Sequence, residues 1–393
     1  MSSYKVRWFK DLDIFLILVV LALCAVSMLA ISSATHSLEG GSKTYVIKQV
    51  VWGLIGLGVM IWLVRTDYRN LTRYVEFGYG VSIVLLILVF FFERVNGAHG
   101  WIPLGGFALQ PSEFFKVVFI LMVAKYLANE QEDEEGRRAD PIRNYLFLAV
   151  YSVLAIGLIV VEPDLGQTMV LMAILAAAMF VHLPSRVFWT LAGIALVVLA
   201  VVVVAVFMYP DQFLTLLDTL VKKGILAQHQ YGRFESFIYP ERDLAGSGYQ
   251  VYQAKVAIGS GQMFGKGLYQ GSQTQGSWVP EQQTDFIFTV IGEELGFVGS
   301  VAVIFLFFLM IYRIVANGLQ AGDRTGMYIC SMVAGMFTLQ IFENIGMSLQ
   351  LMPMTGVTLP FISYGGSSVL TNFMLTGIVL NIGLRRRKLS FVS

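Results

Sequence analysis

Long apolar runs alternate with short polar segments along almost the whole chain. Each run is about 20 residues long, which allows a helix to cross roughly 30 Å of hydrocarbon. Because a backbone in lipid must satisfy its own hydrogen bonds, such runs predict membrane-spanning helices. We expect spans at 13–32, 45–64, 74–92, 112–128, 145–161, 165–182, 187–209, 286–312, 325–345 and 367–384. The pattern predicts an all-α polytopic membrane protein of about ten helices.

One long polar connection interrupts this pattern, at about 210–285, between the seventh and eighth predicted helices. Its first part has apolar positions at helical spacing (Phe213, Leu216, Leu217 and Leu220), which predicts a short amphipathic helix. That helix fits two placements equally well, in the membrane interface or as a cover over the bundle. Connections of this length are uncommon unless they have a function.

Composition supports a membrane protein without a separate soluble domain. The 393 residues are 56% hydrophobic and 13% charged, well below the roughly 25% charged residues of soluble domains. We therefore predict a single transmembrane domain over residues 1–393. The net charge of +1 argues against nucleic acid as a partner.

The basic residues predict the orientation of the chain in the membrane. The short loops on one side carry most of them: Lys5, Arg7, Lys10, Arg65, Arg69, Arg73, Arg137, Arg138, Arg143, Arg186, Arg313, Arg324 and the tail Arg385 to Lys388. The other side carries little more than Lys43 and Arg94 in its short loops. By the positive-inside rule, both termini are cytoplasmic and the 210–285 loop lies outside.

Candidate chemistry concentrates at 276–299, where a polar loop becomes an apolar span. This stretch contains Glu281, Asp285, Glu293 and Glu294. A charged side chain at the centre of a bilayer costs about 2.5 to 3.5 kcal/mol, so such carboxylates usually have partners or a function. We select Asp285 as the candidate for catalysis. The structural alternative is that Asp285 caps a helix beginning at Phe286.

Other charged residues lie at the ends of predicted spans. Glu113 and Lys116 are three residues apart, so they share one helix face and can form an ion pair. A structural pair and a substrate-lining role are both compatible with this spacing. Asp164 directly precedes a predicted helix, as helix caps do. Lys48 and Glu343 are single charges in other spans.

Metal and nucleotide motifs are not found in the sequence. The four histidines share no metal-ligand spacing, so we predict no zinc site. Lys266 lies between Gly265 and Gly267, but the spacing matches no nucleotide-binding loop. These glycines fit a mobile linker, and they also fit a backbone that approaches an anion.

Short motifs extend over nearly the whole chain. They are Asn96-Gly-Ala with Trp101; Gln110-Pro-Ser-Glu-Phe-Phe-Lys116; Glu162-Pro-Asp-Leu-Gly166; Gly248-Tyr-Gln250 and Ala257 to Gly261; Pro280-Glu281 and Thr284 to Phe288; Glu293 to Gly296; Asn344 to Met347; Pro353-Met-Thr-Gly356; Leu359-Pro-Phe361; and Ser363 to Ser368. Together they resemble the shape, elongation, division and sporulation (SEDS) family of bacterial membrane proteins, which includes RodA and FtsW. The Pro353-Met-Thr-Gly356 turn is more similar to the elongation branch.

The resemblance implies a peptidoglycan glycosyltransferase that polymerises lipid II at the outer face of the bacterial cytoplasmic membrane, together with a class B penicillin-binding protein. Asp285 would then be the general base for the acceptor hydroxyl. Candidates for binding the substrate are Lys48, Glu113, Lys116, Asp164, Lys266 and Glu281. A divalent cation, Mg²⁺ or Mn²⁺, is left open as a cofactor. The rival hypotheses are a lipid II flippase and a non-catalytic scaffold of the wall-synthesis complex.

Overall fold

The computed structural model describes residues 11–37, 41–93, 100–105, 107–128, 141–224, 226–242 and 246–386. Its long helices are α2 (Ile14–Ala34), α3 (Gly41–Arg65), α5 (Val75–Leu88), α6 (Pro111–Ala128), α7 (Pro141–Val161), α8 (Leu165–His182), α9 (Ser185–Met208), α15 (Gly296–Leu319), α16 (Arg324–Ser348) and α17 (Gly366–Leu384). Within the described residues, eight helices are long and apolar enough to cross a membrane. The all-α polytopic fold is therefore confirmed.

The smaller elements connect these helices. They are α4 (Tyr68–Arg73), η1 (Val89–Phe91), β1 (Ile102–Leu104), β2 (Phe107–Leu109), α10 (Pro210–Lys222), α11 (Gln228–Ile238), η2 (Pro240–Arg242), α12 (Ser247–Ser260), α13 (Ser272–Gln275) and α14 (Ile287–Glu294). The strands β1 and β2 form an antiparallel hairpin in which Ile102 pairs with Leu109. The long connection predicted at 210–285 is thus largely helical.

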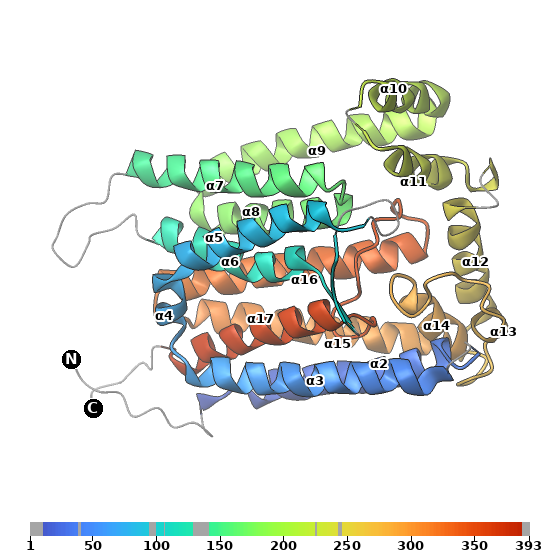
Figure 1. Cartoon of the computed structure of the whole chain (residues 1–393), viewed down its shortest axis with the longest axis horizontal. Coiled ribbons are helices and arrows are strands. Elements are labelled where there is room, and N and C mark those ends of the chain that lie inside the picture. The colour runs from blue at the N-terminus through green and yellow to red at the C-terminus, as the bar shows by residue number, and fades with distance from the viewer. Residues whose placement is uncertain are drawn as a thin grey trace.

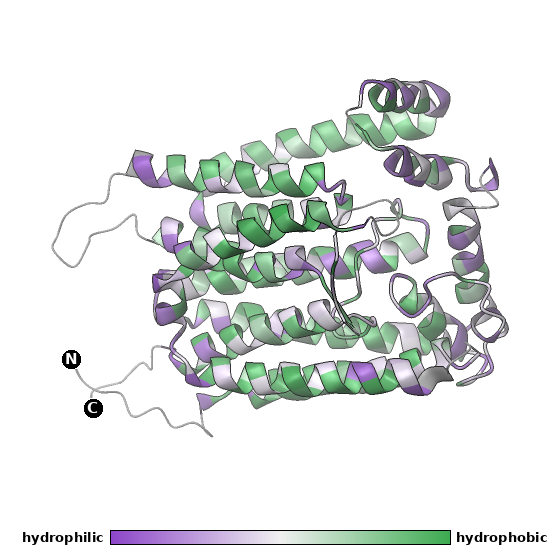
Figure 2. Cartoon of the chain, in the orientation of Figure 1, coloured by the Kyte–Doolittle hydropathy of each residue, from purple (hydrophilic) through white to green (hydrophobic). Residues whose placement is uncertain are grey.

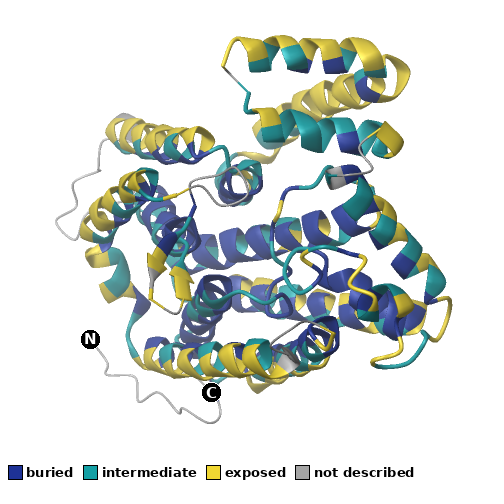
Figure 3. Ribbon diagram, turned by 45° about the vertical axis from the view of Figure 1, so that its right-hand side comes forward, coloured by how far each residue is buried: buried dark blue, intermediate teal, exposed yellow. Residues whose placement is uncertain are grey.

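The long helices run side by side, with the start of α2 and the end of α17 near one end of the bundle and α10 to α14 at the other (Figure 1). Hydrophobic residues cover the middle of the bundle, and hydrophilic residues gather toward its two ends (Figure 2). The helices α16 and α17 form the buried centre. By contrast α9 is exposed along nearly its whole length, and Val206 is its one buried residue (Figure 3).

Carboxylate side chains fix the start of several helices. Asp164 accepts a hydrogen bond from the backbone N–H of Gln167 at 3.0 Å, so the predicted cap of α8 is confirmed. Asp13 and Asp323 cap α2 and α16 in the same way. Such caps satisfy backbone donors that the helix itself leaves unpaired.

The predicted amphipathic helix in the long connection is α10. Leu214 and Leu217 are buried, whereas Leu216, which we placed on the apolar face, is 57% exposed. Because side chains three residues apart share one face of a helix, the buried pair defines the side that contacts the rest of the protein.

The span predicted at 286–312 is wrong as a single helix. The chain forms α14 and α15, separated at Leu295, and Gly296 has a φ of +66°. A Cβ atom at Gly296 would lie 2.3 Å from the backbone nitrogen of Gly265, so this crossing requires glycine. A segment distant in sequence therefore causes the break.

Part of the sequence interpretation lies outside the described residues. These residues are Lys5, Arg7, Lys10, Arg94, the motif Asn96-Gly-Ala, Arg137, Arg138, Arg387 and Lys388.

Candidate active site

A polar cavity of about 310 Å³ lies toward the end of the bundle that carries α10 to α14. Its charged lining residues are Glu113, Asp164, Arg233, Glu281 and Asp285. They come from α6, from the turn before α8, from α11 and from the turn before α14. Four of these five were predicted from the sequence as site residues, so the fold brings together groups that are far apart in the chain.

Several backbone contacts hold Asp285 at the cavity. Its N–H donates to the carbonyl of Glu281 at 3.1 Å, which closes a turn. Its own carbonyl accepts a hydrogen bond from the Asn344 side chain at 2.8 Å, and the same amide donates to the carbonyl of Val357 at 2.8 Å. Asn344 is fully buried in α16 and therefore ties two cavity-lining segments to the rigid centre of the bundle.

The alternative role of Asp285 as a helix cap is not observed. The N-cap residue of α14 is Phe286, and no side chain accepts a capping hydrogen bond there. The carboxylate of Asp285 is partly buried and lines the cavity instead.

The surroundings favour the protonated form of Asp285 more than water would. Burial, followed by the charge of Glu281, raises the pKa of Asp285 from 3.8 to about 6. Arg233 acts in the opposite direction. A carboxylate with a pKa near 6 accepts protons more readily than an ordinary aspartate while staying mostly ionised at pH 7. Burial also raises the pKa of Asp164.

Arg233 is the functional candidate that the sequence interpretation did not select. It lies on α11, and its Nη1 donates to the carbonyl of Thr355 at 3.1 Å. A Cβ atom at Gly356 would lie 3.5 Å from Asp285 Oδ2 and 4.0 Å from Arg233 Nη2, so the two charged groups flank the same glycine. In the sequence, Arg233 is one of several cations in a loop of mixed charge, and no motif separates it from the others.

The predicted ion pair between Glu113 and Lys116 is present. The Lys116 Nζ lies 2.8 Å from Glu113 Oε1, and the side chains are 0% and 2% exposed. Gln167 donates to the same carboxylate oxygen at 2.8 Å. Glu113 lines the cavity, whereas Lys116 is not among the lining residues. Glu343 is also buried, in α16.

Because this pair is buried, removing one partner is expected to be worse than removing both. We predict that Glu113→Ala lowers the melting temperature more than the double change Glu113→Gln with Lys116→Met. A cation left alone in the bundle costs about 3 to 5 kcal/mol, whereas a neutral pair of similar volume costs little. The measurement is thermal unfolding of both purified proteins in the same detergent. Equal melting temperatures would count against pairing.

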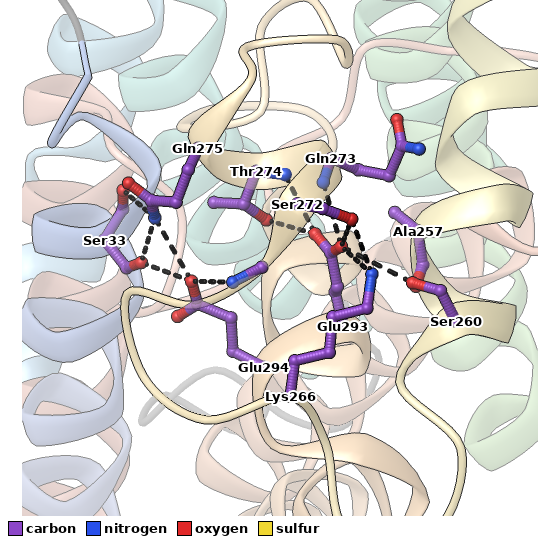
Figure 4. A network of polar contacts seen from close by, with 11 residues as sticks. Ser33, Ala257, Ser260, Lys266, Ser272, Gln273, Thr274, Gln275, Glu293 and Glu294 are labelled. Atoms are coloured by element: carbon purple, nitrogen blue, oxygen red, sulfur yellow. Dashed lines mark hydrogen bonds and ion pairs between the residues drawn. The ribbon is translucent and has the colours of Figure 1, made fainter.

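Lys48 and Lys266 do not line the polar cavity. Lys48 is exposed on α3. The Lys266 Nζ lies 2.7 Å from Glu293 Oε1 and donates to the hydroxyl of Ser272 at 2.7 Å (Figure 4). Neither lysine is among the residues that line the cavity. A role for either one in substrate binding stays a prediction.

Glu293 and Glu294 have a structural function. Glu293 accepts hydrogen bonds from the backbone N–H groups of Gln273 and Thr274 at 2.9 and 2.8 Å. Glu294 accepts one from the hydroxyl of Ser33 on α2 at 2.6 Å (Figure 4). These contacts join α14 to α13 and α2. Burial alone would raise the pKa of Glu293, but the hydrogen bonds from Lys266, Gln273 and Thr274 outweigh burial and lower it. The helix that follows Asp285 is thereby fixed in place.

Within the ranges that the structure describes, no group of three or more His, Cys, Asp or Glu side chains is placed to hold a metal ion. Glu281 and Asp285 do line the same cavity. A divalent cation held jointly by this cavity and a bound pyrophosphate stays a prediction.

Comparisons with known proteins identify the family of this chain. A family model for FtsW, RodA and SpoVE, described as "Cell cycle protein", matches residues 11–388. The probable peptidoglycan glycosyltransferase FtsW of Trichlorobacter lovleyi is 32% identical over 95% of this chain and 93% of its own length. The peptidoglycan glycosyltransferase RodA of Treponema pallidum is 30% identical over 97% of this chain and 100% of its own length.

A solved structure shares the fold. It is described as "Structural coordination of polymerization and crosslinking by a peptidoglycan synthase complex", and it superposes with a TM-score of 0.72 at 28% identity over 95% of this chain and 97% of the other. The motifs, the membrane bundle and these matches lead to one conclusion: the chain belongs to the FtsW, RodA and SpoVE family, that is, the SEDS family.

Proposed function

We propose that this protein is a peptidoglycan glycosyltransferase that polymerises lipid II into glycan strands at the outer face of the cytoplasmic membrane. The observation that carries this proposal is the carboxylate of Asp285, partly buried beside Arg233 in a polar cavity at one end of a membrane bundle. The activity named for the relatives from T. lovleyi and T. pallidum supports it.

In the proposed reaction, Asp285 removes the proton from the acceptor sugar hydroxyl. The hydroxyl oxygen bonds to the anomeric carbon of the donor sugar as the bond from that carbon to the pyrophosphate oxygen breaks. The polyprenyl pyrophosphate leaves with the electron pair, and attack from the opposite side inverts the anomeric centre.

Negative charge builds up on the pyrophosphate as it leaves, so a cation near that position lowers the barrier. Arg233 is the cation that lines the cavity. Lys116 acts from behind the lining, held in position by Glu113 at 2.8 Å. Lys48 and Lys266 remain candidates for contacts with parts of the substrate that extend beyond the cavity.

The second candidate function is lipid II transport across the bilayer. The buried charges of Glu113, Lys116 and Glu343 inside the bundle favour it, since transport paths are lined by such groups. However, the charged groups of the cavity gather toward one end of the bundle, which fits chemistry at one membrane face better than a path through it.

The proposed partner is a class B penicillin-binding protein, which would crosslink the strands that this protein makes. The similarity to a structure whose description names polymerization and crosslinking by a peptidoglycan synthase complex supports such a partner. We assign the protein to the elongation branch on the basis of the turn Pro353-Met-Thr-Gly356.

The decisive experiment is a polymerisation assay with the purified protein, its partner and labelled lipid II. Glycan polymer that forms even when a transpeptidase inhibitor is present supports the glycosyltransferase. Absence of polymer, combined with transfer of lipid II between the leaflets of liposomes, would favour the flippase instead. If the protein does neither, the scaffold hypothesis gains support.

The pKa of Asp285 sets an expected pH profile. A base must be deprotonated to act, so kcat/KM for lipid II should fall as the pH drops through about 6 and level off above about 7. The profile is measured between pH 5 and 8 with a folding control at each pH. A profile that is flat down to pH 5 would contradict Asp285 as the base.

The proposed orientation predicts a labelling pattern. Lys223 is exposed just after α10, and Arg186 is exposed at the start of α9, toward the other end of the bundle. In intact spheroplasts, a membrane-impermeant maleimide should label Lys223→Cys and not Arg186→Cys. The two native cysteines, Cys24 and Cys330, provide the background, measured on the unsubstituted protein. The opposite pattern would invert the topology and with it the outer-face mechanism.

A further inference from the structure

A second cavity, of about 530 Å³, lies near the start of α2 and the ends of α3 and α17. It is formed between α2, α3 and α17, and its lining is apolar, with Ile17, Ile61 and Leu380 among the contributing residues. Arg65, the last residue of α3, is the single charged residue of this lining. The volume is in the range of small-molecule binding sites, about 300 to 1,000 Å³.

Among the residues that the structure describes, Arg65 differs from three other arginines in having no carboxylate partner. Arg69 pairs with Asp323 at 2.9 Å, Arg313 with Asp13 at 2.9 Å and Arg385 with Asp67 at 3.4 Å. Arg65 is exposed, and in the described part of the chain its side chain has no ion pair. No carboxylate lines the cavity to balance it.

We propose that this cavity binds an anionic phospholipid of the inner leaflet, with one acyl chain along the apolar lining and the phosphate on Arg65. The apolar walls fit a hydrocarbon chain, and the cation lies at the end of α3, where the head group of such a lipid would be. A zwitterionic lipid brings its own cation to the same place, so an uncompensated arginine favours a lipid with net negative charge. Basic pockets between transmembrane helices on the cytoplasmic side are known to bind anionic head groups.

The assignment to the inner leaflet rests on the proposed orientation, but the site itself goes beyond the glycosyltransferase function. The polar cavity around Asp285 is lined in part by α11 and by the turn before α14, and these elements lie toward the opposite end of the bundle (Figure 1). Lipid binding can therefore be measured without any measurement of polymerisation, and failure of one proposal leaves the other intact.

The test is native mass spectrometry of the full-length protein titrated with phosphatidylglycerol or with phosphatidylcholine of identical acyl chains. One phosphatidylglycerol should bind about fivefold more tightly than phosphatidylcholine, the preference that one basic residue near a membrane surface provides. Arg65→Gln should remove this preference. Arg186→Gln, a matched change of an exposed arginine outside the cavity, should keep it. Equal affinity for the two lipids, or an unchanged preference in Arg65→Gln, would overturn the proposal.

A second pair of variants tests the acyl chain. Ile61 is 50% exposed at the cavity, so Ile61→Trp fills the cavity without changing the buried core. It should weaken phosphatidylglycerol binding, whereas Ile55→Trp, on an exposed position of the same helix, should not. Equal binding by both tryptophan variants would mean that the lipid lies elsewhere, and the proposed site would be rejected.

Discussion

Replacing Asp285 by asparagine is expected to lower the rate of lipid II polymerisation at least ~100-fold while the protein still folds. The amide has nearly the shape of the carboxylate, and the hydrogen bond from Asn344 goes to the backbone carbonyl of residue 285, which the substitution does not alter. What is lost is the ability to accept a proton at neutral pH. The measurement is the polymerisation rate of the purified variant with its partner bound.

The matched control is Asp211→Asn, which changes an exposed carboxylate on α10 that pairs with Arg242 at 3.6 Å. This variant should polymerise at nearly the normal rate because the carboxylate lies outside the cavity. If the folded and partner-bound Asp285→Asn protein keeps more than about a tenth of the normal rate, Asp285 is not the general base.

Replacing Arg233 by glutamine is expected to lower polymerisation by roughly 10²-fold to 10³-fold, the usual effect of removing one group that stabilises developing charge. The same change should move the pH profile upward. Arg233 lowers the pKa of Asp285, so without this cation the carboxylate binds its proton more tightly and loses it only at higher pH. A variant that has merely lost its structure would be slower at every pH. A slower reaction whose low-pH decline also moves to higher pH shows instead that the charge of Arg233 acts on Asp285.

Two further variants sharpen this test. Arg233→Lys keeps the charge and should restore part of the rate and most of the pH profile, since a lysine cannot reproduce the planar contact with the carbonyl of Thr355. Arg242→Gln removes an exposed arginine of η2 and should leave both the rate and the profile unchanged. An Arg233→Gln profile identical to that of the unsubstituted protein would show that Arg233 does not act on Asp285.

The sequence by itself determined the membrane fold, because lipid makes each span satisfy its backbone within about 20 consecutive residues. Local spacing was also sufficient for two features of the site. Asp164 caps the helix that follows it at 3.0 Å, and Glu113 contacts Lys116 one helical turn away at 2.8 Å. In both cases the partners lie within four residues, where helix geometry fixes their relative position.

Tertiary structure decided the features that depend on distant segments. The expected span at 286–312 is divided because Gly265 crosses the chain at Gly296, and Lys266 pairs with Glu293 instead of lining the polar cavity. Arg233 reaches the cavity because α11 is placed over it, although its sequence neighbours carry no motif. The physical reason is the same in each case: the long connection folds against segments that are distant in sequence, and sequence periodicity carries no information about contacts beyond the element in which it occurs.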